Sequence, residues 1–225
     1  MKDNIIFHAP GNEFLKPYMA REFAGFEGNF ALMVSSTDIY EPDPEGILNE
    51  DAPLRTDSGW KKLEDDFLKE YPQGYILRTA SIIGTGMTCA MRRLTEEIYR
   101  GRFFHFPDND ARKSVVHASD IARAALLLAN GANRTDRHIF NISDDCDPTL
   151  HDIAEAIAYR LANKRISTLS TKPQQWFGRK FYGERYKYYT TTERVSCEAL
   201  KAAIGFTPVP VCEYLRTHVY DENSL

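Results

Sequence analysis

The 225-residue sequence lacks the features that mark secreted, membrane-spanning and nucleic-acid-binding proteins. Its four cysteines are scattered and form no C-x-x-C pair, so we expect reduced thiols in a cytoplasmic protein. No apolar run approaches the ~20 residues of a membrane span, and the first three residues open no signal peptide. The formal net charge of −4 gives no electrostatic case for nucleic acid or an anionic membrane, so we expect neither partner.

What the chain does have is an alternation of strand and helix patterns. Residues 30–34 form a continuous apolar run typical of a buried strand, and residues 75–77 open another. Between them a helix is expected over residues 58–71. Its apolar face consists of Trp60, Leu63, Phe67 and Tyr71. A strand–helix–strand unit of this length is a right-handed parallel crossover, so we expect an α/β fold.

Further elements extend this pattern in both directions. Buried-type strands are expected over residues 4–9 and 138–142. Helices are expected over residues 12–28, and over residues 87–100 with Gly101 as the stop. The apolar positions of these two helices are Leu15, Met19, Phe23 and Phe26 in the first, and Met87, Met91, Leu94 and Ile98 in the second.

Two helix starts can be read from capping residues. Ser119 is predicted to cap a helix whose buried face carries Ile121, Ala125 and Leu128. Thr149 and Asp152 have the spacing of a capping box, with Asp in place of the usual Glu.

Several of these stretches resemble the extended short-chain dehydrogenase/reductase superfamily, the NAD-dependent epimerases and dehydratases. The resemblance rests on MVSSTDIYEP at residues 33–42, on ILRTASIIGTG at 76–86 and on RKSVVHASDIA at 112–122. It implies a Rossmann-like parallel sheet with a small C-terminal substrate lobe. The implied division gives residues 1–85 and 114–145 to an NAD(P)-binding portion, and residues 86–113 and 146–225 to the lobe. The whole chain forms one interleaved unit.

The resemblance also assigns candidate catalytic residues. Ser36 matches the family's catalytic Ser/Thr, and Lys62 matches its catalytic Lys. The catalytic Tyr position holds Ser58, one helical turn before Lys62. In the family the phenolate exchanges a proton with the substrate hydroxyl, and the Lys lowers the phenol's pKa from about 10. A serine hydroxyl is far less acidic and cannot replace the phenol as a base without help.

NAD or NADP is the cofactor that the family implies. Pro10, Gly11, Ser35, Lys62 and Thr79 match positions beside it. Lys113 matches the Arg that contacts the diphosphate in nucleotide-sugar enzymes, with Arg112 next to it. A cation at this position suits a phosphate group, although Lys lacks the bidentate fork of Arg. A basic strand edge exposed to solvent would explain the two cations equally well.

The sequence pattern starts at what resembles the family's fourth strand. We therefore expect the strand–glycine-rich turn–helix that holds a dinucleotide pyrophosphate to be missing, and residues 4–9 to form an open sheet edge. Residues 84–89 match G-x-G-x-x-G/A only loosely, because the last position is Cys89. We interpret this segment as a strand-exit loop near the substrate.

Two function classes remain open. The first is an atypical NAD(P)-dependent epimerase or dehydratase acting on a small molecule of nucleotide-sugar type. The second is a non-catalytic relic or partner-binding module, either a homodimer or a chain that needs a complementing N-terminal fragment. Residues 176–189 interleave aromatic and basic side chains, which also suits stacked nucleic-acid bases, but we favour a packed substrate lobe there. No metal site is expected.

Overall fold

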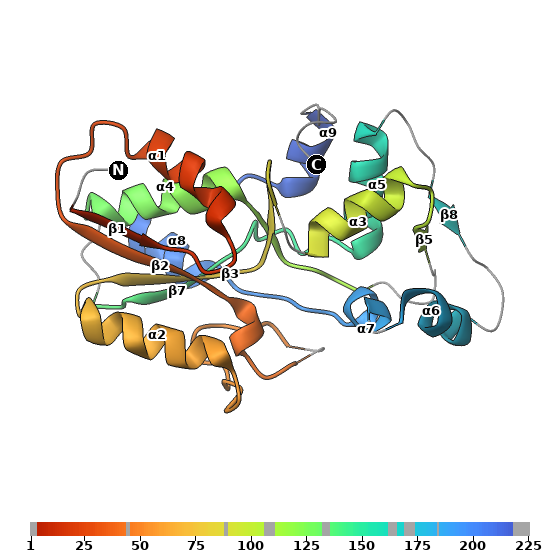
Figure 1. Ribbon diagram of the computed structural model, residues 1–225, viewed down its shortest axis with the longest axis horizontal. Coiled ribbons are helices and arrows are strands. Elements are labelled where there is room, and N and C mark those ends of the chain that lie inside the picture. The colour runs from red at the N-terminus through yellow and green to blue at the C-terminus, as the bar shows by residue number, and fades with distance from the viewer. Residues whose placement is uncertain are drawn as a thin grey trace.

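The computed structural model describes residues 4–43, 46–87, 90–105, 111–131, 136–161, 166–168, 174–183 and 185–217. A main sheet with its helices forms one half of the molecule, and a smaller lobe forms the other (Figure 1). Within the described residues no helix is long and apolar enough to cross a membrane. The three cysteines in this part of the chain, Cys146, Cys197 and Cys212, are free thiols, and Cys89 lies outside it.

The main sheet is parallel and has the order β1-β2-β3-β7. These strands span Ile5–His8, Phe30–Ser36, Tyr75–Thr79 and Ile139–Ile142. Apolar residues at the centre of β2 and β3 explain why these strands form, since Met33, Val34 and Leu77 are fully buried. The predicted α/β fold with a Rossmann-like parallel sheet is confirmed.

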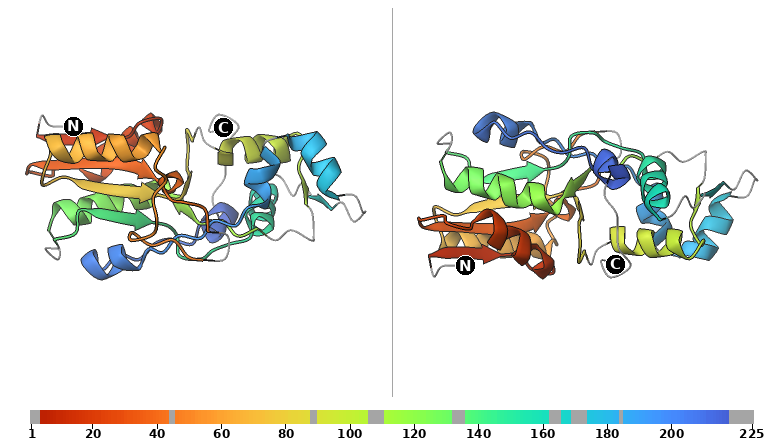
Figure 2. Two further views of the ribbon diagram at one scale, coloured as in Figure 1. Left: turned by 90° about the horizontal axis from the view of Figure 1, so that it is seen from below. Right: turned by 90° about the horizontal axis from the view of Figure 1, so that it is seen from above.

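Helices cover both faces of this sheet. α2 (Gly59–Glu70) lies on one face, while α1 (Lys16–Glu22) and α4 (Ala118–Ala129) lie together on the other. Figure 2 shows α2 in front of the sheet from below, and α1 and α4 in front from above. α8 (Glu198–Ile204) packs against β7 and α4, and Gly205 ends it in the left-handed conformation.

The first helix is shorter than predicted. A short 3-10 helix, η1 (Glu13–Leu15), leads into α1, which ends at Glu22 instead of continuing to residue 28. Gly25 has a φ of +84°, which takes the chain out of the helix. The apolar spacing still describes the buried side, because Leu15, Met19 and Phe23 are all in the core.

The predicted cap of α4 was wrong by two residues. His117, not Ser119, is the N-cap: its Nδ1 accepts a hydrogen bond from the backbone N–H of Ser119 at 3.2 Å. An acceptor nitrogen can cap a helix as a hydroxyl does, and sequence rules that favour Ser, Thr, Asp and Asn overlook it. The predicted buried face of α4 is correct, since Ile121, Ala125 and Leu128 are in the core.

The lobe has its own hydrophobic core. It contains α3 (Ala90–Tyr99), α5 (Leu150–Arg160), α6 (Gln174–Tyr182), α7 (Arg185–Thr190), α9 (Val211–Thr217) and the short paired strands β5 (Phe104–His105) and β8 (Ser167–Thr168). The predicted apolar face of α3 is buried there. Tyr182 and Tyr189 from the aromatic–basic segment are also buried in this core, as the packed-lobe interpretation expects.

A two-stranded ribbon joins the two halves. β4 (Ser81–Ile83) pairs in parallel with β6 (Val115–His117). Successive side chains of a strand point to opposite faces. Accordingly Ile82 and Val116 belong to the core of the sheet, whereas Ile83 and Val115 belong to the core of the lobe.

The chain after α8 is held by two buried carboxylates. Asp120 of α4 accepts a hydrogen bond from the backbone N–H of Val209 at 2.7 Å, and Asp144 accepts one from Val211 at 3.0 Å. Asp144 also accepts from the N–H of Cys146 at 3.3 Å. These bonds fix the start of α9 against the end of β7.

The capping box at α5 gives a direct stability test. The Thr149 hydroxyl accepts from the Asp152 N–H at 3.0 Å, and the Asp152 carboxylate accepts from the Thr149 N–H at 2.9 Å. We expect Thr149→Ala to lower the free energy of unfolding by about 1 kcal/mol, measured by urea denaturation. Thr149→Ser keeps the acceptor and should retain most of it, so equal losses in both variants would contradict the capping role.

Candidate functional site

Most of the predicted site residues follow the carboxyl ends of neighbouring strands. Ser36 ends β2 and Thr79 ends β3, while Pro10 and Gly11 follow β1. In open parallel sheets this edge is where ligands bind. The topology therefore brings the predicted cofactor-side residues to one edge of the sheet.

A buried polar network lies directly behind this edge, between the sheet and α2. The Arg78 guanidinium forms a two-point pair with the Glu64 carboxylate, with N–O distances of 3.0 and 2.7 Å. The Ser35 hydroxyl donates to the same carboxylate at 2.6 Å. Arg78 and Glu64 are 3% and 1% exposed, so each buried charge is compensated by the opposite charge of its partner.

Tyr40 completes this network. Its hydroxyl accepts from Arg78 Nη1 at 3.0 Å and donates to Asn141 Oδ1 at 2.6 Å. Burial raises the pKa of Tyr40, and Arg78 only partly opposes that effect. Burial alone would lower the pKa of Arg78, but Glu64 and Tyr40 together outweigh that effect and raise the pKa. The phenol is thus a neutral structural group that supports the sheet edge.

The two candidate serines both cap helices. The Ser36 hydroxyl accepts from the Asp38 N–H at 3.1 Å and starts the 3-10 helix η2 (Thr37–Ile39). The Ser58 hydroxyl accepts from the Trp60 N–H at 3.3 Å and starts α2. Each hydroxyl keeps its own proton free for a further acceptor. Lys62, one turn into α2, is exposed to solvent.

The predicted cofactor-side residues divide into buried and exposed groups. Ser35 and Thr79 are buried, and the Thr79 hydroxyl donates to the Ser35 carbonyl at 2.9 Å. Pro10 is half-buried and Gly11 is exposed. Gly11 has a φ of +71°, and its N–H donates to the Glu13 carboxylate at 3.3 Å. Turn geometry therefore explains the glycine at this position.

A pocket of about 310 Å³ lies where η2 and its following loop meet the chain leading out of α7. We call it the Lys113 pocket. Its lining residues are Thr37, Asp38, Tyr40, Pro42, Asp43, Leu48, Arg55, Lys113, Lys187, Thr191, Thr192 and Glu193. The sequence motif predicted Lys113, but Arg55 and Lys187 have no motif and only the fold brings them here.

Lys113 is the most unusual side chain in this pocket. It is 2% exposed, and its ammonium lies 3.7 Å from the Glu193 carboxylate. Glu193 is also bound by the Thr37 hydroxyl at 2.9 Å. Burial lowers the pKa of Lys113, while Glu193 and Asp38 oppose that effect. Because burial disfavours the charged form of the lysine, an anion that enters the pocket beside it would stabilise the ammonium.

Arg112 points away from Lys113. Its guanidinium donates to the Asp147 carbonyl at 3.0 Å, and its side chain is exposed. The structure therefore separates the two adjacent cations: Lys113 lines the pocket, and Arg112 fixes the loop after β7.

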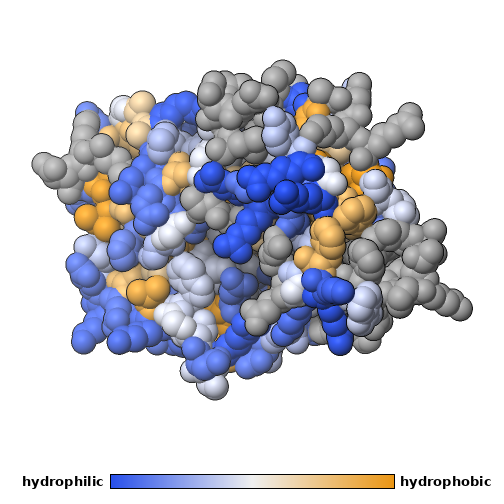
Figure 3. Space-filling view, turned by 45° about the vertical axis from the view of Figure 1, so that its right-hand side comes forward, coloured by the Kyte–Doolittle hydropathy of each residue, from blue (hydrophilic) through white to orange (hydrophobic). Residues whose placement is uncertain are grey.

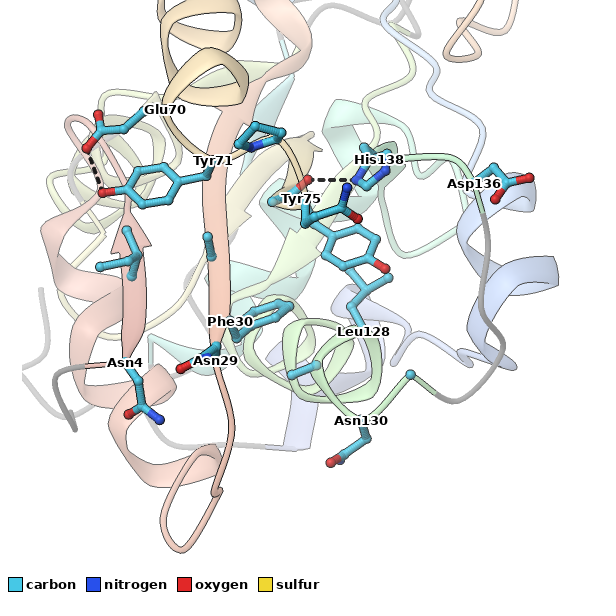
Figure 4. Close-up of a pocket in the computed structure, with 17 residues that line it drawn as sticks. Asn4, Asn29, Phe30, Glu70, Tyr71, Tyr75, Leu128, Asn130, Asp136 and His138 are labelled. Atoms are coloured by element: carbon cyan, nitrogen blue, oxygen red, sulfur yellow. Dashed lines mark hydrogen bonds between the residues drawn. The ribbon is translucent and has the colours of Figure 1, made fainter.

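A larger groove, of about 930 Å³, lies at the opposite, amino-terminal edge of the sheet (Figure 4). Tyr75 stacks between Phe30 and His138 there, with centroid distances of 6.0 and 5.4 Å. His138 also contacts the Gly74 carbonyl at 3.0 Å. None of the predicted site residues lines this groove, so it is separate from the candidate site.

The loop matching G-x-G-x-x-G/A follows β4, and its last two residues lie outside the described part. The Thr85 N–H donates to the Tyr18 hydroxyl at 2.8 Å, so this amide is already engaged. A Cβ on Gly84 would lie 2.8 Å from that of Ala118, which explains this glycine by close packing. Within the described residues, no strand–glycine-rich turn–helix forms a pyrophosphate cradle.

No family model and no curated protein sequence matches this chain. Solved structures do match its fold. A putative epimerase from Burkholderia cenocepacia J2315 has a TM-score of 0.64 at 16% identity, covering 95% of this chain and 73% of that one. UDP-glucose 4-epimerase from Thermotoga maritima with UDP-glucose has 0.62 at 16% identity, covering 95% and 75%. RMD from Pseudomonas aeruginosa complexed with NADPH has 0.65 at 15% identity, covering 95% and 79%. The chain therefore has the Rossmann-like fold of the NAD-dependent epimerases and dehydratases, as its motifs predicted.

Proposed function

We propose that this chain is an atypical, intracellular member of the extended short-chain dehydrogenases/reductases that binds a diphosphate-bearing substrate of nucleotide-sugar type in the Lys113 pocket. The observation that carries the proposal is the buried ammonium of Lys113, which lines the pocket and lies 3.7 Å from the Glu193 carboxylate. Solved neighbours with UDP-glucose or UDP-N-acetylmuramic acid in complex support this ligand class.

Three further residues of the pocket suit a diphosphate, although the carboxylates of Asp38, Asp43 and Glu193 also line it. Arg55 and Lys187 add two cations. The Thr192 hydroxyl accepts from the Arg112 N–H at 3.2 Å, so its own proton can be donated to a phosphate oxygen. Glu193 holds Lys113 in place and is itself held by Thr37. The pocket volume of about 310 Å³ is at the small end of ligand sites, which suits a diphosphate with part of its sugar.

The catalytic assignment stays with Ser36, Ser58 and Lys62. Ser36 would hydrogen-bond the reacting oxygen, and Lys62 would hold the ribose of NAD or NADP. The described residues offer Pro10, Gly11, Ser35 and Thr79 along the cofactor side but form no cradle for the pyrophosphate. The proposal therefore places substrate binding in the pocket and assigns no hydride-transfer step to it.

The test is binding of UDP-glucose by isothermal titration calorimetry. We expect Lys113→Met to weaken binding about tenfold, because a neutral side chain of similar length removes the buried charge that faces the diphosphate. Lys61→Met is the matched control, since Lys61 is a partly exposed lysine on α2 paired with Asp65. Unchanged binding in Lys113→Met would remove the pocket from the proposal.

A partner-binding module is the second candidate, favoured by the position of β1. Within the described residues β1 pairs only with β2, so its other edge has unpaired backbone groups, and Ile6 and Phe7 are only half-buried. A second copy, or a fragment that adds a strand to this edge, would cover them.

Sedimentation should then show a complex that Ile6→Lys dissociates. Millimolar NAD(H) and NADP(H) should not bind the isolated chain.

A further inference from the structure

A hollow that none of the predicted site residues lines is present on the lobe. It lies between α3 and α6, at the end of the molecule away from the main sheet (Figure 1), and has a volume of about 520 Å³. We call it the arginine depression. Its lining residues are Arg93, Glu96, Glu97, Arg100, Arg102, Phe181 and Tyr182.

Arginine side chains outnumber carboxylates in the lining of the depression, with three of the former and two of the latter. Glu96 is paired with Arg92, outside the depression, at 3.0 Å, and Glu97 accepts a hydrogen bond from the Tyr189 hydroxyl at 2.6 Å. The guanidinium groups of Arg93, Arg100 and Arg102 are exposed and form no ion pair with any described residue. Three available guanidinium groups converge here on a chain whose net charge is −4. This local excess of positive charge suits an anion.

The aromatic wall of the depression is held in place. The Tyr182 hydroxyl accepts from the Phe104 N–H at 2.8 Å and donates to the Arg102 carbonyl at 3.2 Å. Phe181 packs edge-on against Phe104, with ring centroids 5.6 Å apart, yet remains 49% exposed. Figure 3 shows strongly hydrophilic side chains directly beside small hydrophobic areas on this side of the molecule. An oriented and exposed ring beside guanidinium groups offers a stacking surface next to an anion site.

We propose that the arginine depression binds a nucleoside phosphate, at a site separate from the Lys113 pocket. The planar forks of Arg100 and Arg102 would bind phosphate oxygens at two points each, and Arg93 would add a third cation. The base would stack on the exposed face of Phe181, an interaction that tolerates every base. The volume of the depression falls in the usual range for small-molecule sites.

The test uses ADP and inorganic pyrophosphate, titrated calorimetrically into Lys113→Met protein so that any binding in the other pocket is weakened. Adding Arg100→Ala and Arg102→Ala together should weaken the binding of both probes at least tenfold, because both probes carry phosphate groups. Phe181→Ala should weaken the binding of ADP about tenfold and leave the binding of pyrophosphate unchanged, because only ADP has a base to stack. Arg179→Ala, an exposed cation of α6 outside the depression, should bind both probes normally.

A ten-residue oligothymidylate separates two sources of the same chemistry. Tighter binding of the oligonucleotide than of ADP, with the same variant losses, would show that the nucleoside phosphates come from a strand. Binding of ADP alone would show that a free nucleotide is the ligand. Absence of ADP binding at millimolar concentration, unchanged binding in the double arginine variant, or equal effects of Phe181→Ala on both probes would each overturn the proposal.

Discussion

Replacing Glu64 with alanine is expected to lower the free energy of unfolding by about 3–5 kcal/mol, the largest single effect that we anticipate in this protein. The change leaves the Arg78 guanidinium, which is 3% exposed, without its carboxylate. It also removes the acceptor of the Ser35 hydroxyl. A buried charge without a partner costs far more than the lost pair itself contributes. Urea denaturation followed by circular dichroism measures the loss.

Two controls separate a buried unpaired charge from a general loss of contacts. The double variant Glu64→Leu/Arg78→Met removes both charges and should recover most of the stability, since well-packed apolar residues often replace a buried pair without loss. Asp65→Ala breaks the exposed Lys61–Asp65 pair on the same helix and should cost less than about 1 kcal/mol. A double variant no more stable than Glu64→Ala would show that the site cannot be repacked and that the network is needed for shape.

Asp144 is expected to make stability fall as pH rises from about 4 to about 6. Burial raises the pKa of Asp144 to about 6, although the N–H groups of Val211 and Cys146 oppose that effect. In the unfolded chain the carboxyl has a pKa of about 3.9. Between these values the folded protein holds a proton that the unfolded chain has released, so stability is fully present below pH 4 and declines up to pH 6. At about 1.4 kcal/mol per pH unit, this group contributes about 3 kcal/mol across the window.

The comparison of wild type with Asp144→Asn isolates this contribution, because other carboxyls titrate equally in both proteins. Asparagine has one side-chain oxygen where Asp144 offers one oxygen each to the N–H groups of Val211 and Cys146, so the variant should be less stable at acidic pH. Its stability should nevertheless lack the decline between pH 4 and 6. Asp65→Asn, on the exposed face of α2, should retain the wild-type decline. Parallel pH profiles for wild type and Asp144→Asn would assign the proton to another group.

The fold was largely predictable because it depends on patterns that the sequence displays locally. Continuous apolar runs gave β2 and β3, and the helical spacing of Leu94 and Ile98 gave the buried face of α3. Local rules failed where a single residue changed the local geometry. The Gly25 backbone ended the first helix early, and the imidazole of His117 replaced the predicted serine cap. Neither change alters the spacing of apolar residues, so the hydrophobic pattern could not reveal it.

The candidate site was predictable only in part. The family motif led to Ser36, Ser58, Lys62 and Lys113, because these positions are defined by short spacings. Glu64 was missed, although a carboxylate two residues after Lys62 is visible in the sequence, because nothing local indicates that it pairs with Arg78 of β3, between α2 and the sheet. Arg55 and Lys187 meet Lys113 only through the tertiary fold. The signal that could have found Glu64 is an acidic residue on the apolar side of a predicted helix.

The ribbon of β4 and β6 has a consequence for how the molecule responds to heat. Each strand contributes neighbouring side chains to both hydrophobic cores, so Ile82 and Ile83 cannot leave their cores independently. If either half melts, the other loses part of its packed interior at the same moment. Calorimetry should therefore record one endotherm for the whole chain, with no separate step for the lobe.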